Sequence, residues 1–229
     1  MTDSPAMLFS PFTIGATRFR NRIFSSGHMT VLLENGRPGP AMAAYHGARA
    51  RGGAGLVILE AARPHPSGSG SRPAIRAYED SCIEGYRLIA EACQPHGCRV
   101  FGQLSHPGRE MSHAADGTRA VAHAPSPVAN ERFHVMPRAM PVSLIGEIVA
   151  GFGAAAGRMR AAGLDGVEVV ASHGYLLAQF LNPRVNLRAD GYGGSFDGRL
   201  RLLREVLAAV RAGAGPDMVV GLRISGDEM

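Results

Sequence analysis

Apolar runs rich in β-branched residues recur along the chain, separated by segments with helical periodicity. The runs are nearly continuous and do not alternate with polar residues, which is typical of parallel strands buried on both faces. We therefore predict strands at residues 22–26, 55–61, 98–104, 166–171 and 218–225. Helices are predicted at residues 41–53, 81–97, 143–163 and 198–215, and each of these segments ends at a glycine, as helix C-termini often do.

Two segments repeat the same local pattern. "ARARGGAGLVILE" and "GRMRAAGLDGVEVV" share a basic helix end, a glycine turn and a strand, which indicates a repeated βα unit. Repeated βα units form either a doubly wound sheet or a (β/α)₈ barrel. The first predicted strand is followed by "SSGHMTVLLENG", which lacks the GxGxxG turn of a doubly wound nucleotide-binding sheet. Polar or small residues follow each strand, and the pattern therefore predicts an α/β fold of the TIM-barrel type.

The number of predicted strands is smaller than a closed barrel requires. Five strands are predicted where such a barrel has eight, and the last lies directly before the final residue. An open edge would expose unpaired backbone and apolar side chains. We therefore expect residues 1–229 to be the N-terminal portion of one barrel domain, from a longer polypeptide or a truncated reading frame. The segment from Ser105 to Val142 is predicted to be a long loop over the active-site end of the barrel.

The amino-acid composition excludes some classes of enzyme and argues against one class of ligand. The chain contains no lysine, which excludes enzymes that form a Schiff base or hold pyridoxal phosphate through a lysine amine. The net charge of +5 therefore comes from arginine. These arginines are scattered, with no basic run and no interleaved aromatic residues, so the sequence argues against nucleic-acid binding. The high pI is better explained by codon bias and binding of anionic ligands.

The sequence gives little indication of a membrane span, a secretory signal or a metal site. No uninterrupted apolar window of about 18 residues is present, and the N-terminus lacks the pattern of a secretory signal, so we expect a cytoplasmic protein without a membrane span. Cys82, Cys93 and Cys98 form no CxxC pair and are interpreted as buried or inert thiols. His106 and His113 lack the spacing and the carboxylate companion of a zinc site, so no metal is expected.

Four motifs, in this order and spacing, resemble the Old Yellow Enzyme family. They are "RFRNRIFSSGHMT", "RARGGAGLVILEA", "FGQLSHPGRE" and "SHGYLLAQFLNPRVNLRADGYGGS", and the resemblance covers nearly the whole chain. The sequence is most similar to the branch that contains 2,4-dienoyl-CoA reductase, trimethylamine dehydrogenase and N-methylproline demethylase-like proteins. The resemblance implies a flavin oxidoreductase whose FMN lies on top of a (β/α)₈ barrel.

The resemblance assigns cofactor-binding roles to particular residues. It implies that the amide of Gln103 pairs with the polar edge of the flavin ring, for which an amide offers both a donor and an acceptor. Arg223 would place positive charge near flavin N1 and the C2 carbonyl. Small residues let the main chain approach a flat ring. The residues expected to cradle the ring in this way are Ser25, Ser26, Gly27 and Ala62.

The same resemblance implies that Tyr175 delivers a proton on the side opposite to the hydride, and that His173 anchors the polar group of the substrate. Hydrogen-bond donors belong at this position because they polarise the atom that accepts hydride. His28 and His106 are candidates to line the substrate pocket, and His106 with Arg109 is expected to stabilise the loop after the third strand. A structural role for His173 as a helix cap and for Tyr175 in the core is the alternative.

Two positions depart from the family pattern. Val170 stands where ene-reductases usually have the first histidine of the substrate-binding pair, which argues against a simple enone reductase and agrees with the dienoyl-CoA reductase and amine-demethylase branches. The segment "GGSFDGR" replaces the frequent "GGSxENR", which is expected to change loop contacts and not chemistry.

Three hypotheses follow. In the first, the chain is an FMN-dependent oxidoreductase that takes hydride from NAD(P)H or from an amine and passes it to an unsaturated small molecule; it could form homo-oligomers. An iron–sulfur (4Fe–4S) cluster and FAD are expected only with a longer C-terminal part. In the second, the chain is a non-catalytic fragment that needs further strands, or a partner, to bind FMN, because the phosphate loops follow the seventh and eighth strands. The third, a non-flavin aldolase or isomerase barrel, is disfavoured by the absent lysine.

Overall fold

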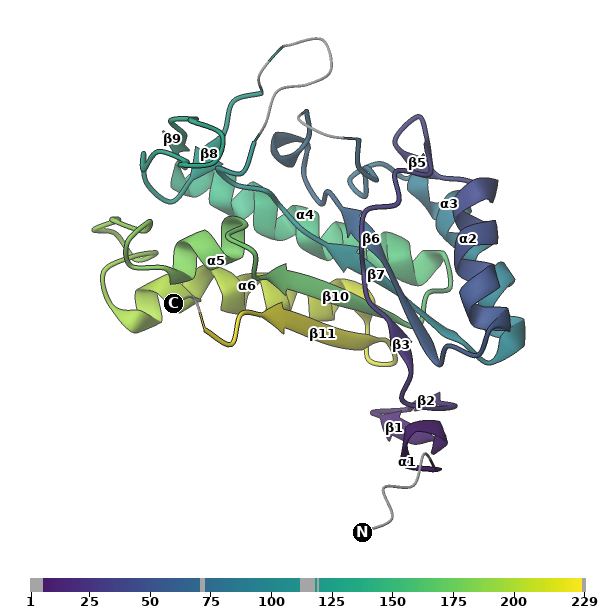
Figure 1. Ribbon diagram of the computed structural model, residues 1–229. Helices are drawn as coiled ribbons and strands as arrows, with labels where there is room; N and C mark the ends of the chain where they lie inside the picture. The colour runs from purple at the N-terminus through teal and green to yellow at the C-terminus, as the bar shows by residue number, and fades with distance from the viewer. Residues whose placement is uncertain (1–5, 71–72, 112–117, 119, 228–229) are drawn as a thin grey trace.

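The computed structural model describes residues 6–70, 73–111, 118 and 120–227. A five-stranded parallel sheet, in the order β11-β10-β7-β6-β3, forms its centre (Figure 1). The strands are β3 (Phe24–Ser25), β6 (Leu56–Ala62), β7 (Arg99–Leu104), β10 (Gly166–Ala171) and β11 (Val219–Ile224). Each falls within a predicted apolar run, except that β6 extends one residue beyond its run, to Ala62. The spatial order follows the chain order without a reversal, so successive right-handed crossovers place the helices on one side, as in a barrel. The predicted α/β barrel class is confirmed, with β3 and β11 at the open edges.

Four long helices cover the outer side of this curled sheet. They are α2 (Pro40–Arg51), α3 (Cys82–Cys93), α4 (Val142–Ala161) and α6 (Phe196–Ala214). They match the predicted helices within a few residues, except that the third strand is approached through a 3₁₀ turn, η2 (Gln94–His96), which replaces the end of the predicted helix. Alternate strand residues such as Val57, Val100 and Val167 are fully buried against this helical layer.

Helices α4 and α6 pack through small residues. A Cβ on Gly213 would overlap the carbonyl oxygen of Gly153, so the two backbones touch only because both positions lack side chains. Helix α4 is long and apolar enough to cross a membrane by length and composition alone. Its fully buried residues, among them Ile145, Phe152 and Met159, belong to the main core, which identifies α4 as a core helix.

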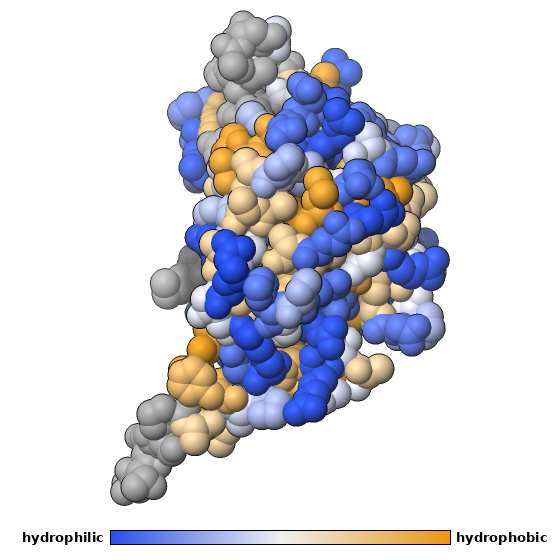
Figure 2. Space-filling view, turned by 90° about the vertical axis from the view of Figure 1, so that its right-hand side faces the viewer, coloured by the Kyte–Doolittle hydropathy of each residue, from blue (hydrophilic) through white to orange (hydrophobic). Residues whose placement is uncertain are grey.

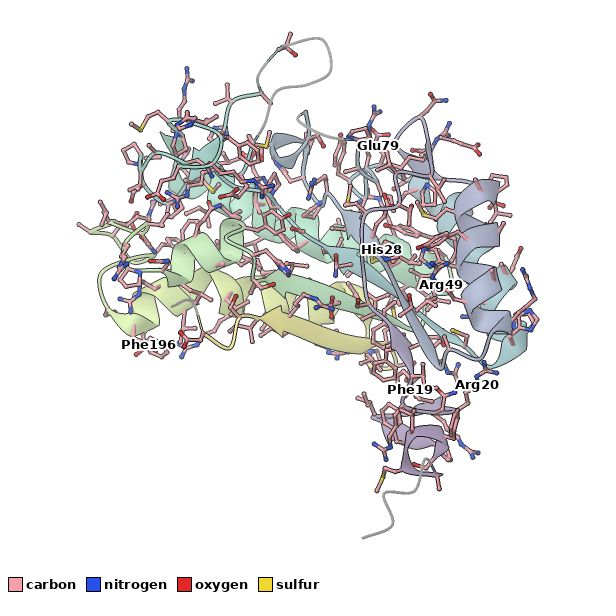
Figure 3. All side chains as sticks on the ribbon, in the orientation of Figure 1. Phe19, Arg20, His28, Arg49, Glu79 and Phe196 are labelled. Atoms are coloured by element: carbon pink, nitrogen blue, oxygen red, sulfur yellow. The ribbon has the colours of Figure 1, made fainter. Side chains whose placement is uncertain are left out.

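A phenylalanine cluster fills the inner face of the sheet at its amino end. Leu56, Ile58 and Phe101 point inward from β6 and β7, and Phe19 is buried against them. The rings of Phe19 and Phe101 meet edge to face with centroids 6.0 Å apart. Phe19 comes from a hairpin of β1 (Phe12–Ile14) and β2 (Thr17–Phe19), which with α1 (Ala6–Phe9) projects below the sheet (Figures 1 and 3). Sequence analysis did not predict this hairpin.

Short elements complete the fold at the carboxyl end of the sheet. Helix α5 (Leu176–Leu181), toward which the tips of β10 and β11 point, was not predicted (Figure 1). The expected long loop after β7 contains two short paired strands, β8 (His123–Ala124) and β9 (Arg138–Ala139). A second pair, β4 (Leu33–Glu34) and β5 (Arg37–Pro38), follows β3, and a 3₁₀ turn, η1 (Pro66–Gly68), follows β6.

The outer face of α2 and α3 is hydrophilic. Figure 2 views the molecule from this side and shows hydrophilic residues spread over most of it, with hydrophobic residues between them. Such a mixed surface is normal for helices that face solvent. The polar site described next is instead lined by residues at the carboxyl ends of the parallel strands and in the turns that follow them.

Candidate functional site

A cavity of about 170 Å³ opens at the carboxyl end of the parallel strands. In a barrel fold this end carries the binding and catalytic residues, because the βα loops converge there. Its wall is formed by Gly27, His28, Met29, Ala61, Arg63, Gln103, Val170, His173, Tyr175 and Arg223. Most residues that sequence analysis selected thus meet in one place, although they come from different strands and turns.

Glu168, which sequence analysis missed, supports two residues of the cavity wall. Its Oε1 accepts hydrogen bonds from Gln103 Nε2 at 2.7 Å and from Arg223 Nε at 2.9 Å, and its Oε2 lies 3.3 Å from Arg223 Nη2. The parallel register places Glu168 opposite Gln103 and Val170 opposite Arg223. An acidic residue inside the buried run "GVEVVA" is the sequence signal that could have identified it, because such a residue requires a partner.

The backbone at Gly27 is packed too closely against its neighbours to admit a side chain. A Cβ at this position would lie 2.6 Å from Gln103 Nε2 and 2.8 Å from the carbonyl oxygen of Leu59. The backbone after β3 therefore passes directly over the Gln103 amide and the middle of β6. Gly27 lines the cavity beside the Gln103 amide, so a main chain without a side chain lies next to a donor and acceptor pair, which suits a planar ligand.

A tight turn between β10 and α5 presents two of the candidate catalytic side chains. His173 has φ of 60° and Gly174 has φ of 69°, so both lie in the left-handed region that disfavours side chains. Ser172 Oγ lies 2.6 Å from His173 Nδ1. The ring centroids of His173 and Tyr175 are 6.0 Å apart, and both side chains line the cavity. Strained non-glycine residues often mark functional sites.

Gln179 holds this turn against the loop after β7, and sequence analysis did not select it. Its Nε2 donates to the carbonyl oxygens of Gly174 at 2.6 Å and Pro107 at 3.1 Å, and its Oε1 accepts from the Arg109 amide at 3.1 Å. Gln179 is 2% exposed. An isolated glutamine in the apolar segment "LLAQFL" was the available signal. The predicted stabilising role of Arg109 agrees with its guanidinium bonds to the carbonyls of Val128 and Ala129.

His28 lines the cavity with both ring nitrogens engaged. Nδ1 lies 3.3 Å from the carbonyl oxygen of Ser26 and therefore carries the proton, so Nε2 accepts from the hydroxyl of Tyr45. The guanidinium of Arg49 stacks on the Tyr45 ring at 3.4 Å from its centroid. Figure 3 shows His28 and Arg49 on neighbouring elements beside the sheet. These contacts connect the segment after β3 to α2.

Several candidate residues lie outside the cavity wall. Ser25 ends β3 and Ser26 is exposed. Ala62 is fully buried in the helix-facing core, and Ala61 lines the cavity in its place. The register between β6 and β7 shifts between Ile58 and Ala61. After this irregularity the next β6 residue to face the cavity is Ala61, and Ala62 faces the helices.

His106 is 2% exposed and binds within the protein. Its Nδ1 accepts from the Gly108 amide at 3.1 Å, and its Nε2 lies 3.0 Å from Ser67 Oγ. Burial, with contributions from Arg63 and the neighbouring histidines, lowers the pKa of His106 to about 3. His106 is therefore neutral and joins the loops after β6 and β7, outside the cavity wall. His113 lies outside the described residues, among which no group of three or more His, Cys, Asp or Glu side chains is placed to hold a metal.

These features define a class of protein: a curled, singly wound α/β sheet with a cationic and amide-lined cavity at its carboxyl end. The profile of the NADH:flavin oxidoreductase / NADH oxidase family matches residues 7–229. The chain therefore belongs to this family, the Old Yellow Enzyme-like FMN-dependent NAD(P)H oxidoreductases, as the sequence motifs predicted.

Sequence relatives agree with this assignment. The chain is 38% identical over 231 residues to the NADH oxidase of Thermoanaerobacter brockii, and the match covers 100% of the chain and 35% of that protein. It is 34% identical to the NADPH dehydrogenase of Bacillus subtilis, covering 89% of the chain and 60% of that protein. It is also 34% identical to the N,N-dimethylglycine/sarcosine dehydrogenase of Chromohalobacter salexigens, covering 96% and 32%. The chain thus spans roughly a third to three fifths of these relatives.

Solved structures give the same result. Morphinone reductase in complex with tetrahydroNAD superposes with a TM-score of 0.84 at 32% identity, covering 95% of this chain and 63% of that one. A 2-naphthoyl-CoA reductase complex superposes with a TM-score of 0.88 at 27% identity, covering 96% and 35%. Both neighbours extend well beyond the part that this chain matches.

Proposed function

We propose that this chain forms the FMN-binding part of an FMN-dependent oxidoreductase that uses NAD(P)H as electron donor. The observation that carries the proposal is the convergence of Gln103, Arg223, His173 and Tyr175 on one cavity, where Gly27 lets the backbone approach the Gln103 amide. When bound, FMN supplies hydride transfer at its N5 atom. The chain itself contributes binding, orientation and a proton.

The residues present fit FMN in shape and in chemistry. The amide of Gln103 offers a donor and an acceptor to the polar edge of a flavin, and Arg223 supplies positive charge for its electron-rich side. Gly27, with the adjacent backbone of Ser25 and Ser26, lets the main chain lie against the flat ring. Arg63 and Arg223 line the cavity and no Asp or Glu is among its described lining residues; Glu168 pairs with Arg223, and the remaining positive charge favours an anionic ligand.

In this proposal Tyr175 and His173 act on the substrate. The hydroxyl of Tyr175 donates a proton to the substrate from the side opposite to the hydride. His173, held by Ser172, anchors the polar group of the substrate above the cavity. Ring nitrogens of His28 are already engaged, so His28 shapes the wall and does not donate to the substrate.

Val170 directs the choice of substrate. It is 3% exposed and lines the cavity at the position from which a side chain would donate a hydrogen bond to a simple enone carbonyl. An apolar wall at this point favours activated enoyl or amine substrates that are anchored elsewhere. The relatives' names include both kinds of chemistry, an N,N-dimethylglycine/sarcosine dehydrogenase and a multifunctional alkene reductase/demethylase. Val170→His should therefore raise activity on simple enones.

A second candidate function rests on the open sheet. Phe24 at one edge is 45% exposed, and Leu222 and Ile224 at the other are 40% and 56% exposed. In this alternative, residues 1–229 are part of a single barrel domain that binds FMN only with further strands or a partner. A 4Fe–4S cluster and FAD would belong to a longer C-terminal part. Cytoplasmic location and homo-oligomer formation are proposed on the same family basis.

The visible absorption spectrum of the purified chain separates the two candidates. The chain is mixed with excess FMN and freed of unbound cofactor, and circular dichroism is recorded in parallel. A retained, shifted flavin spectrum that bleaches on anaerobic addition of NADPH or NADH supports the oxidoreductase. A folded chain that retains no flavin favours the fragment. Gln103→Leu and Arg223→Met should each weaken FMN retention, whereas Arg87→Met on the exposed face of α3 should not.

A further inference from the structure

Glu168 lies directly behind the two residues that would face the polar edge of FMN. We propose that it is a positioning residue, which holds Gln103 and Arg223 in their binding orientation and moderates the positive charge of the cavity. This inference rests on the proposed FMN site. It concerns a side chain that neither the sequence motifs nor the family assignment selected.

The hydrogen bonds of Glu168 are specific in direction. Its carboxylate occupies Nε and Nη2 of Arg223 and one Nε2 proton of Gln103. Among the described residues, no protein group binds Arg223 Nη1 or Gln103 Oε1. Gln103 therefore keeps its second amide proton and its Oε1 acceptor for a ligand, and Arg223 keeps the N–H donors of Nη1. Because the Glu168 carboxylate binds only one side of the guanidinium and one proton of the amide, the remaining polar atoms of both groups are available to a ligand.

Partial burial and strand pairing restrict the movement of Glu168 and Arg223. The Glu168 side chain is 12% exposed and that of Arg223 is 32% exposed. Both lie on the inner face of adjacent paired strands, so their backbones cannot shift independently. Removing the carboxylate would leave Arg223 without its partner and Gln103 free to rotate. The orientation of both wall residues depends on this one acceptor.

Glu168 also sets the charge that a bound cofactor meets. Its negative charge compensates that of Arg223 at the cavity edge where electron density would increase on cofactor reduction. Neutralising Glu168 while keeping an acceptor should make the surroundings more positive. Positive surroundings favour the more negative, reduced cofactor, so the midpoint potential should rise.

The test uses Glu168→Gln and Glu168→Ala with a matched control at the opposite end of β10. Asp165 there accepts from Arg99 Nη1 at 2.7 Å and Gln94 Nε2 at 3.1 Å, and its side chain is 10% exposed. Asp165→Asn therefore removes the same charge from a similar arginine and glutamine pair, remote from the cavity. FMN affinity is measured by flavin fluorescence and the midpoint potential by spectroelectrochemistry.

We expect Glu168→Ala to weaken FMN binding at least about tenfold, because both wall residues lose their acceptor. Glu168→Gln should bind FMN nearly as tightly as the wild type but shift the potential upward. Asp165→Asn should change neither quantity, although it lowers stability. Wild-type affinity and potential in both Glu168 variants would overturn the proposal, as would equal effects of Asp165→Asn.

Absence of FMN binding by the wild-type chain would contradict the proposed function without deciding the role of Glu168. That role is then judged in the cofactor-free chain. A double-mutant cycle of Glu168→Ala and Arg223→Met in urea unfolding should show coupling, and the Gln103 side-chain amide resonance should shift in Glu168→Ala. No coupling together with an unchanged amide resonance would overturn the positioning role.

Discussion

The rings of His173 and Tyr175 face the same cavity with centroids 6.0 Å apart and planes inclined at 33°. They flank Gly174, and the left-handed backbone at both His173 and Gly174 turns the chain sharply after β10. Residues two apart in an extended strand also share a face, but here the turn lifts both above the strand end. The pattern of a histidine, a glycine and a tyrosine after a buried strand thus places two titratable groups at the mouth of the cavity.

Tyr175→Phe should separate proton transfer from cofactor binding. The variant keeps the ring and loses the hydroxyl, so FMN retention should be unchanged. The rate of acceptor reduction in a single turnover should fall by about 10²- to 10⁴-fold, the usual contribution of a positioned acid. Reduction of bound FMN by NAD(P)H provides the internal control, since it needs no proton from Tyr175. An unchanged rate of acceptor reduction would show that another group supplies the proton.

Gly27→Ala should abolish or strongly weaken FMN binding. The added Cβ would collide with Gln103 Nε2 and with the backbone oxygen of Leu59, and the latter cannot move without distorting β6. Gly146→Ala is the matched control, because a Cβ there meets nothing within 4 Å and the position lies inside α4. The control should bind FMN normally and gain up to about 1 kcal/mol of stability. Titration by flavin fluorescence and urea unfolding measure the two effects.

Stability should fall as the pH drops below about 6.5, in part because of His46. Burial, Arg49 and His28 lower the pKa of His46 to about 4, and neither ring nitrogen has a partner among the described residues. His46 therefore binds a proton near pH 6.5 in the unfolded state, but only near pH 4 in the folded state. The stabilisation is complete above the unfolded pKa and is lost between these values.

The loss attributable to His46 amounts to about 3 kcal/mol at most. His46→Leu removes the titrating group without leaving a large cavity, so its unfolding free energy should depend less steeply on pH between 4 and 6.5. His134→Asn, at an exposed position, should retain the wild-type slope. Equal slopes in wild type and His46→Leu, measured by urea unfolding at several pH values, would contradict this assignment.

The cysteines should be unreactive in the folded protein. Cys82, Cys93 and Cys98 are fully buried, and desolvation raises their pKa values to about 11, 12 and 11. Because the thiolate is the reactive form, a thiol reagent at about pH 8 should label none of them without unfolding. In denaturant all should react. Rapid labelling of the native chain would mean that α3 or the start of β7 opens locally.

Much of the fold was predictable because its signals are local. Strands buried on both faces leave continuous apolar runs, such as "GLVILEA" in β6, and the helices between them carry one apolar side and a glycine at the end. The hairpin that brings Phe19 under the sheet was not predictable in this way. Its strands are short, and it is stabilised by contacts with Phe101, which lies far along the chain.

The sequence by itself determined the parallel α/β class, the family and the identities of the polar residues that follow each strand. The reason is that the apolar runs of buried strands and the order of the motifs are properties of the sequence alone. Only the tertiary structure decided which of these residues meet. The register of β10 on β7 and β11 made Glu168 the common partner of Gln103 and Arg223, and the irregularity in β6 placed Ala61 at the cavity and Ala62 in the core. Strand pairing is a non-local choice, so one residue of register decides whether a side chain reaches the site or the helices.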